Sequence, residues 1–344
     1  MAARNTVVVC VHGANQSKKK GTSAKTDGRA WEKCLELGKK KSPPLLLTVN
    51  GDRNDAIAQY HATCHGGSAY PHYVGWGNVW YGDIWRELTD GTPVEEVFSP
   101  RLNESSNYDR KQRNTVLRIL ERHIMKVKFD ELVGFYELGV VSAQAGPRYA
   151  GKTLYEAICA RTLEHIRKIT HGGEHDFVLL GHSMGCAACY NVLSHLSAAK
   201  SGRPLVSVEG ALSPDYVAQV HEFAARPARC LGLITFGNYT GYNWCQRLNN
   251  RILHGELKRC FVYPDACGRW HNFFTVAGGD PYVLDDTLGD SMEGDRKRDF
   301  QDVPVWRWPG TNIGHGRSNW FRRKNFVAGV RDVLETHLYR PGTM

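Results

Sequence analysis

The 344-residue sequence has no apolar run close to the roughly eighteen residues needed to cross a bilayer. It also lacks a secretory signal, because the apolar run of residues 7–11 is too short for a signal core and leads directly into His12-Gly13. These absences predict a cytoplasmic protein and leave open export by a machine that reads no N-terminal signal.

Cysteine shows no compact repeating spacing, although the chain has ten. In a long chain without a signal, this pattern indicates reduced thiols rather than a disulfide framework. Cys186 and Cys189 fall where a helix is expected, and we interpret them as packing residues. A group of histidines and one cysteine within residues 61–72 matches no zinc pattern. We therefore expect neither a metal nor a cofactor.

No nucleic-acid-binding motif accompanies the formal net charge of +9, so nucleic acid is not expected as a partner. The positive charge favours anionic partners in general. Part of it lies in two lysine runs, residues 18–20 and 39–41. These are either solvated loops or contacts to an anionic membrane surface. The sequence does not indicate an oligomeric state.

The most informative segment is Asp176–Asn191, in which the apolar residues 177–180 lead into Gly-His-Ser-Met-Gly and then into a pattern of small residues. A strand followed by a tight turn and a helix would expose Ser183 at the turn as a nucleophile. Glycine is expected at positions 181 and 185 because a Cβ at either would clash where strand and helix approach each other. An ordinary Gly-Ser turn is the alternative.

An earlier strand supplies the second part of such a site. Residues 6–11, TVVVCV, end in His12-Gly13-Ala14-Asn15. In acyl-transfer sites of this type, one oxyanion donor is the backbone N–H after the nucleophile and another follows an earlier strand. This pattern predicts Met184 and Ala14 as the oxyanion-hole donors. We interpret His12 as a brace for the turn rather than a catalytic group.

Residues 51–146 depart from a simple alternation of strands and helices, and we interpret them as an insertion or cap within a single domain of residues 1–344. The segment contains an aromatic, glycine-rich block in which Trp76, Trp80 and Trp85 are candidates for lining an acyl pocket. Packing in a core or strand is the alternative for these aromatic residues.

A competing motif occupies residues 146–153, GPRYAGKT, which satisfy the phosphate-loop pattern. Lys152 and Thr153 would then meet a nucleotide phosphate and Mg²⁺. The pattern also requires an acidic residue closing a later strand, whereas residues 177–180 close on Gly-His-Ser. The alternative is a glycine turn that caps a helix over residues 152–169.

Further apolar runs are expected as strands, namely residues 45–49, 231–236, 270–277 and 303–308. Helices are expected over residues 30–37, 218–225 and 318–338. Strands that alternate with helices along the whole chain predict an α/β fold with a mainly parallel sheet covered on both faces.

A nucleophilic serine needs a positioned imidazole, and the imidazole needs a carboxylate. In hydrolases with this order, the acid follows the serine and the histidine follows the acid, each at the carboxyl end of a strand. Asp280 meets this condition, and Asp265, Asp285 or Asp302 are the substitutes. Beyond it lie only His315 and His337, and His337 belongs to the expected final helix. The predicted triad is therefore Ser183, Asp280 and His315.

On these motifs, over residues 5–17 and 150–335, the chain resembles the α/β-hydrolase superfamily, in particular serine hydrolases of the lipase and esterase type. The resemblance implies the α/β-hydrolase fold, the triad and oxyanion donors named above, and hydrolysis of a carboxylic ester that is lipid-like. A thioesterase, amidase or peptidase could use the same residues. Acyl length and head group are not indicated, because the departure at residues 51–146 falls where substrate choice commonly resides.

Overall fold

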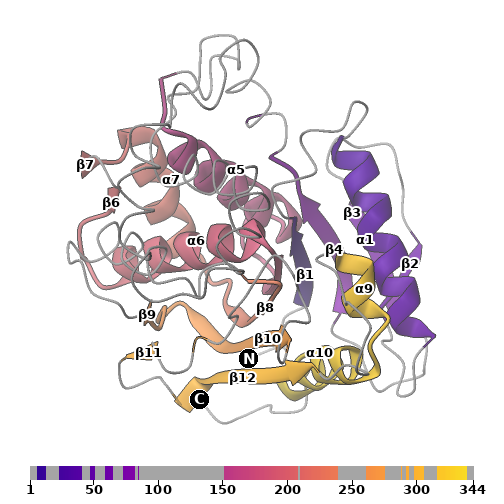
Figure 1. Cartoon of the computed structure of the whole chain (residues 1–344). Helices are drawn as coiled ribbons and strands as arrows, with labels where there is room; N and C mark the ends of the chain where they lie inside the picture. Colours follow the sequence, from indigo (N-terminus) through magenta and orange to yellow (C-terminus); the bar gives the residue numbers. More distant parts are fainter. Residues whose placement is uncertain are drawn as a thin grey trace, which may run out of the picture.

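The computed structural model describes residues 6–12, 23–40, 47–50, 59–64, 73–81, 84, 151–207, 210–238, 261–275, 288, 292–293, 298–305 and 316–338. Within them, an eight-stranded sheet forms the centre of the molecule, in the order β12-β10-β8-β5-β1-β4-β3-β2 (Figure 1). The strands are β1 (Thr6–Val11), β2 (Leu47–Asn50), β3 (Gln59–Cys64), β4 (Tyr73–Val79), β5 (Asp176–His182), β8 (Cys230–Phe236), β10 (Cys267–Thr275) and β12 (Phe300–Val305).

Six neighbouring strands of this sheet, from β12 to β4, run parallel, and only β3 and β2 add antiparallel pairs at one edge. Every residue of β1 and β5 is buried, as expected for parallel strands covered on both faces. Two small ladders lie outside the sheet, β6 (Val206–Ser207) with β7 (Gly210–Ala211) and β9 (Phe261–Val262) with β11 (Met292–Glu293). The predicted α/β class with a mainly parallel sheet is confirmed.

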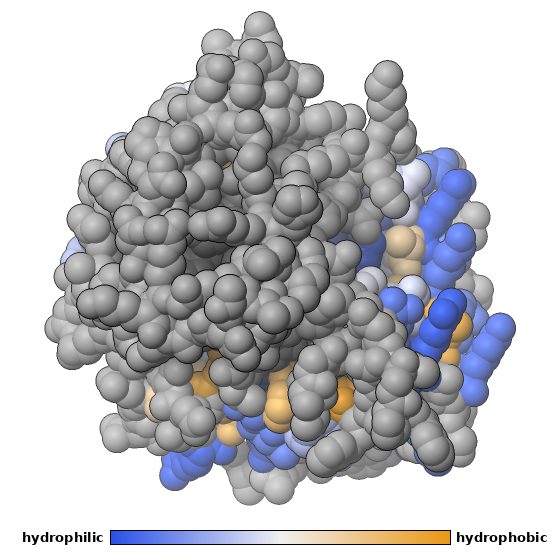
Figure 2. Space-filling view, viewed as in Figure 1, coloured by the Kyte–Doolittle hydropathy of each residue, from blue (hydrophilic) through white to orange (hydrophobic). Residues whose placement is uncertain are grey.

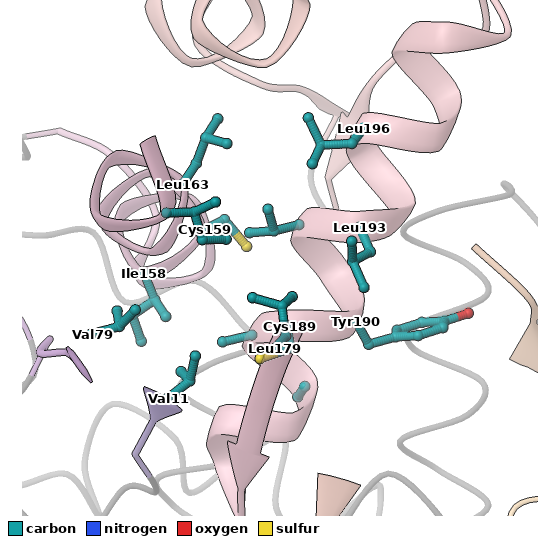
Figure 3. Close-up of a cluster of buried hydrophobic side chains, with 14 of the residues drawn as sticks. Val11, Val79, Ile158, Cys159, Leu163, Leu179, Cys189, Tyr190, Leu193 and Leu196 are labelled. Carbon is teal, nitrogen blue, oxygen red and sulfur yellow. The ribbon is translucent and has the colours of Figure 1, made fainter. Parts of the chain in front are cut away.

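Helices cover the two faces of the sheet and enclose two separate hydrophobic cores. One face carries α5 (Leu154–Ile169), α6 (Met184–Lys200) and α7 (Pro214–Ala224), and the other carries α1 (Ala24–Lys39), α9 (Arg317–Phe321) and α10 (Lys324–Leu338). In the first core, Figure 3 shows Cys159 of α5 and Cys189 of α6 among aliphatic side chains. Cys189 is a free thiol whose pKa is raised by burial, which fits the packing interpretation.

Three of the expected helices differ from the prediction in their boundaries. The helix expected over residues 218–225 is α7, which begins at Pro214 after the N-cap Ser213. The first helix begins at Ala24 rather than at residue 30, because Ser23 and Thr26 form a capping box. The expected helix over residues 318–338 is interrupted between α9 and α10. Phe321 and Phe326 would point about 140° apart on one continuous helix, whereas the interruption places their ring centroids 5.1 Å apart in the core.

The described part of the segment 51–146 contributes to the central sheet. β4 pairs with β1 along its whole length, and β3 pairs with β4. The rest of the predicted insertion, apart from Trp80, Tyr81 and Ile84, lies outside the described residues.

Candidate active site

Ser183 occupies the single-residue turn between β5 and α6. Its backbone has φ 57° and ψ −128°, and among the described residues only His171 is another non-glycine residue with positive φ. Such a conformation costs about 1–3 kcal/mol and persists only where the surroundings impose it. Here the Ser183 N–H donates to Phe236 O at 3.1 Å, and the Cys186 N–H donates to Ser183 O at 3.0 Å. The Ser183 hydroxyl makes no capping hydrogen bond to α6.

The two glycines around Ser183 are required by close approach, as predicted. A Cβ at position 181 would lie 3.0 Å from Cys186 Cα. A Cβ at position 185 would lie 2.4 Å from Val11 O and 2.6 Å from His12 O. The first contact lies between strand and following helix, whereas the second brings the start of α6 against the carboxyl end of β1. Gly185 therefore joins the two segments expected to supply the oxyanion donors.

Met184 is the first residue of α6, and the first N–H groups of a helix have no partner within it. Its N–H thus belongs to a helix end with a partial positive charge, which suits a developing oxyanion. The other predicted donor, Ala14, lies outside the described residues. The strand that leads towards it, β1, ends at Val11, and the carbonyls of Val11 and His12 lie beside Gly185.

His12 braces the end of β1 against the end of β4. Its ring stacks on Tyr81 with 4.0 Å between centroids, and its Nε2 accepts the Tyr81 N–H at 3.3 Å. The Tyr81 hydroxyl donates to His12 O at 2.6 Å. Because Nε2 accepts a hydrogen bond from an amide, this nitrogen is not available as a catalytic base. The bracing role expected for His12 matches these contacts.

The three candidate tryptophans lie in different surroundings. Trp76 is 1% exposed in the core between the sheet and α1, where it packs as a core residue. Trp80 is 5% exposed and its ring lies 4.9 Å from that of His12, close to the end of β1. Trp85 lies outside the described residues. Of the two described candidates, Trp80 is the one that lies beside the end of β1.

Asp280 and His315 also lie outside the described residues, but the elements that carry them are in place. β10 ends at Thr275, five residues before Asp280. Gly316, which directly follows His315, is the N-cap of α9, and successive Cα atoms are about 3.8 Å apart.

Aromatic contacts hold α9 close to the serine. The Phe236 ring lies 5.6 Å from that of Trp320 and 6.1 Å from that of Phe321. The carbonyl of the same Phe236 accepts the Ser183 N–H. One residue thus contacts both the nucleophile turn and the helix that begins two residues after His315.

A buried polar network, which the sequence patterns did not reveal, links the neighbouring strands β8, β10 and β12. Asn272 Oδ1 accepts from Thr235 Oγ1 at 2.9 Å and from Asn238 Nδ2 at 3.3 Å, while Asn272 Nδ2 donates to Asp302 Oδ1 at 2.8 Å. Asp302 also accepts the Leu288 N–H at 3.1 Å. These bonds fix the strand before Asp280 and the chain after it.

The same network bears on the choice of catalytic acid. Asp302, a substitute for Asp280, lies within β12 opposite Asn272 rather than beyond the carboxyl end of the strand. Its oxygens are already engaged by Asn272 and Leu288. Asp302 is therefore placed as a structural acceptor, and Asp280, which lies outside the described residues, stays the predicted acid.

The phosphate-loop motif is described from Gly151 onward. Lys152 pairs with Glu156 at 3.5 Å, and the Thr153 hydroxyl caps α5 by accepting the Glu156 N–H at 3.1 Å. Glu156 in turn accepts hydrogen bonds from the Ser213 N–H and hydroxyl. Of the two residues that would meet a phosphate, Lys152 thus pairs with Glu156 and Thr153 caps α5. These contacts match the capping alternative.

No family model matches the chain, and no curated protein and no solved structure is significantly similar to it. Across the described ranges, no group of three histidine, cysteine or acidic side chains could hold a metal ion. Within those same ranges, no helix combines the length and apolar character of a bilayer span.

Proposed function

We propose that the protein is a serine hydrolase of the α/β-hydrolase superfamily that cleaves a carboxylic ester through an acyl-enzyme on Ser183. The observation that carries the proposal is the strained turn at Ser183, held between β5 and α6 while Gly185 seals the start of α6 against the end of β1. A left-handed, non-glycine residue at a strand-to-helix turn is costly, and such strain concentrates at functional sites.

In the proposed mechanism, His315 removes the Ser183 proton as Oγ attacks the ester carbonyl, and Asp280 stabilises the imidazolium. The backbone N–H groups of Ala14 and Met184 hold the oxyanion. Collapse of the tetrahedral intermediate breaks the carbon–oxygen bond of the ester, and His315 donates its proton to the departing alcohol. Water then attacks the acyl-enzyme by the same route, releasing the acid and restoring Ser183.

The proposed substrate class is a lipid-like ester, at an anionic surface. Exposed basic side chains on α1 support the second part, and they share that side of the helix with the half-buried Glu32 and Glu36. Lys25, Arg29 and Lys33 are exposed at four-residue intervals on α1, and side chains at this spacing share one side of a helix. Figure 2 shows hydrophilic side chains gathered over this helix. Thioesters and amides remain alternative substrates, to be separated by a substrate panel.

Replacing Ser183 by alanine tests the proposal directly. Wild-type protein should hydrolyse esters of graded acyl length and should be labelled at Ser183 by a fluorophosphonate, and the variant should lose both activities. Ser201→Ala, at the exposed far end of the same helix, is the matched control and should behave as wild type. Unchanged ester turnover in Ser183→Ala would end the proposal.

The nucleotide-binding alternative is tested in the same preparation. With Lys152 paired to Glu156, we expect no saturable binding of ATP or GTP by calorimetry. Binding that Lys152→Ala abolishes would favour the phosphate-loop function instead.

A further inference from the structure

A buried ion pair lies at the start of α9. Arg317 Nη1 is 2.7 Å from Asp27 Oδ1, with the two side chains 5% and 0% exposed. Asp27 Oδ2 accepts a hydrogen bond from Asn78 Nδ2 at 2.9 Å. The Arg317 guanidinium carbon lies 4.5 Å from the centre of the Trp31 ring. These contacts join α9 to α1 and to β4, segments that lie far away in the sequence.

Stability alone does not account for this pair. Taking two charges out of water costs several kcal/mol, and apolar residues of similar size often serve a core equally well. Of the ion pairs between described residues, only this one has both side chains almost fully buried. Attraction between opposite charges depends on Arg317 staying opposite Asp27, so the pair favours one position of α9 against α1 more than apolar packing would.

Few contacts within α9 itself stabilise its first turn. The helix has five residues, and its N-cap, Gly316, provides no side-chain hydrogen bond. Isolated helices of this length do not form in water, and a cation such as Arg317 at a helix N-terminus opposes the helix dipole. Tertiary contacts therefore hold the first turn of α9, and the ion pair with Asp27 is the charged contact among them.

The same contacts reach the nucleophile. Trp31, beneath the Arg317 guanidinium, has its ring 6.3 Å from that of Phe236. Phe236 accepts the Ser183 N–H through its carbonyl and packs on Trp320 through its ring. Phe236 thus contacts both the turn at Ser183, through its carbonyl, and the residues around the first turn of α9, through its ring.

We infer that Arg317 and Asp27 are positioning residues for the catalytic histidine. The inference rests on the proposed function. His315 stands two residues before Arg317, so the ion pair fixes the point from which the chain presents the imidazole to Ser183. Without the pair, the first turn of α9 moves and the imidazole loses its alignment with Oγ, although the substrate pocket and Ser183 itself are unchanged.

The test compares Arg317→Met, which keeps the length of the stem, with Arg317→Lys, which keeps the charge. Arg322→Met, at the exposed end of α9, is the matched control. A displacement of about 1 Å costs on the order of 10²-fold in rate. We expect Arg317→Met to lower kcat and the rate constant for fluorophosphonate labelling about 10²-fold with little change in KM. Arg317→Lys should recover part of the loss, and Arg322→Met should match wild type.

Two readouts separate positioning from general damage. The fraction of Ser183 finally labelled should stay near that of wild type, whereas partial unfolding would lower this end point. The labelling rate of Arg317→Met should also rise continuously with pH as hydroxide replaces the misaligned base. If Arg317→Met does not fold, the double variant Asp27→Leu/Arg317→Met removes both charges and takes its place.

The outcomes are decisive in either direction. A folded variant that lacks the pair but labels at the wild-type rate overturns the positioning role. Failure of wild-type protein to label at Ser183 overturns the proposed function instead, so the two failures are distinguishable.

Discussion

Replacing Gly185 by alanine tests whether contact between α6 and the end of β1 supports catalysis. The new Cβ would lie 2.4 Å from Val11 O and 2.6 Å from His12 O. Both neighbours are backbone atoms, so a change of rotamer cannot relieve the clash. To restore a contact of 3.4 Å, the start of α6 must retreat from β1 by about 1 Å.

The expected magnitudes follow from that retreat. Overpacking of a core typically costs about 1–3 kcal/mol, and we expect the free energy of unfolding to fall by this amount. The same movement displaces the Met184 N–H from the oxyanion position. A misplacement of about 1 Å, or loss of one donor, lowers the rate about 10²-fold. The kcat of the folded variant should therefore fall about 10²-fold.

Gly329→Ala is the matched control, because its Cβ would lie 2.5 Å from Phe273 Cε1, under α10 and outside the proposed machinery. Urea unfolding should show comparable destabilisation in the two variants. Ester turnover, normalised to the sites that a fluorophosphonate titrates, should fall only in Gly185→Ala. Wild-type turnover per titrated site in Gly185→Ala would refute the oxyanion role of this junction.

Three further predictions concern the pH dependence of stability, the contact between His12 and Tyr81, and the basic side chains of α1. Burial lowers the pKa of His165 to about 4, so only the unfolded state takes up a proton as pH falls below about 6.5. Through His165 the free energy of unfolding should drop by about 2 kcal/mol between pH 7 and pH 5 in urea titrations, and His165→Gln should remove this share. The dependence due to His271, whose pKa burial also lowers to about 4, should remain. Tyr81→Phe deletes the 2.6 Å hydrogen bond from the Tyr81 hydroxyl to the His12 carbonyl. We expect kcat to fall about tenfold and the free energy of unfolding to fall by about 1–3 kcal/mol. Unchanged kcat would contradict the role of the His12–Tyr81 contact in supporting the site. Charge reversal at Lys25, Arg29 and Lys33 should abolish salt-sensitive sedimentation with phosphatidylserine vesicles, and wild-type protein that does not sediment would contradict a membrane role for α1.

Local patterns account for the elements that the sequence predicted well. The β-branched run of β1 and the apolar run of β5 are buried along their whole length. The glycines of Gly-His-Ser-Met-Gly stand where a Cβ cannot fit. The burial of the two strands and the contact of Gly181 with Cys186 depend on local sequence, so the sequence alone carried the α/β class and the nomination of Ser183. The clash at Gly185 is with Val11 and His12, on a distant segment.

Only the tertiary structure decided the contacts between distant segments. Pairing of β4 with β1 places Trp76 in a core instead of a pocket. The Asn272 network and the Arg317–Asp27 pair join side chains from different strands and helices. No periodicity along the chain marks such partners, because their proximity depends on how strands order in the sheet and how helices pack on it. The sequence thus determined which residue occupies the tight turn between β5 and α6, and the packing of the whole molecule decided what surrounds it.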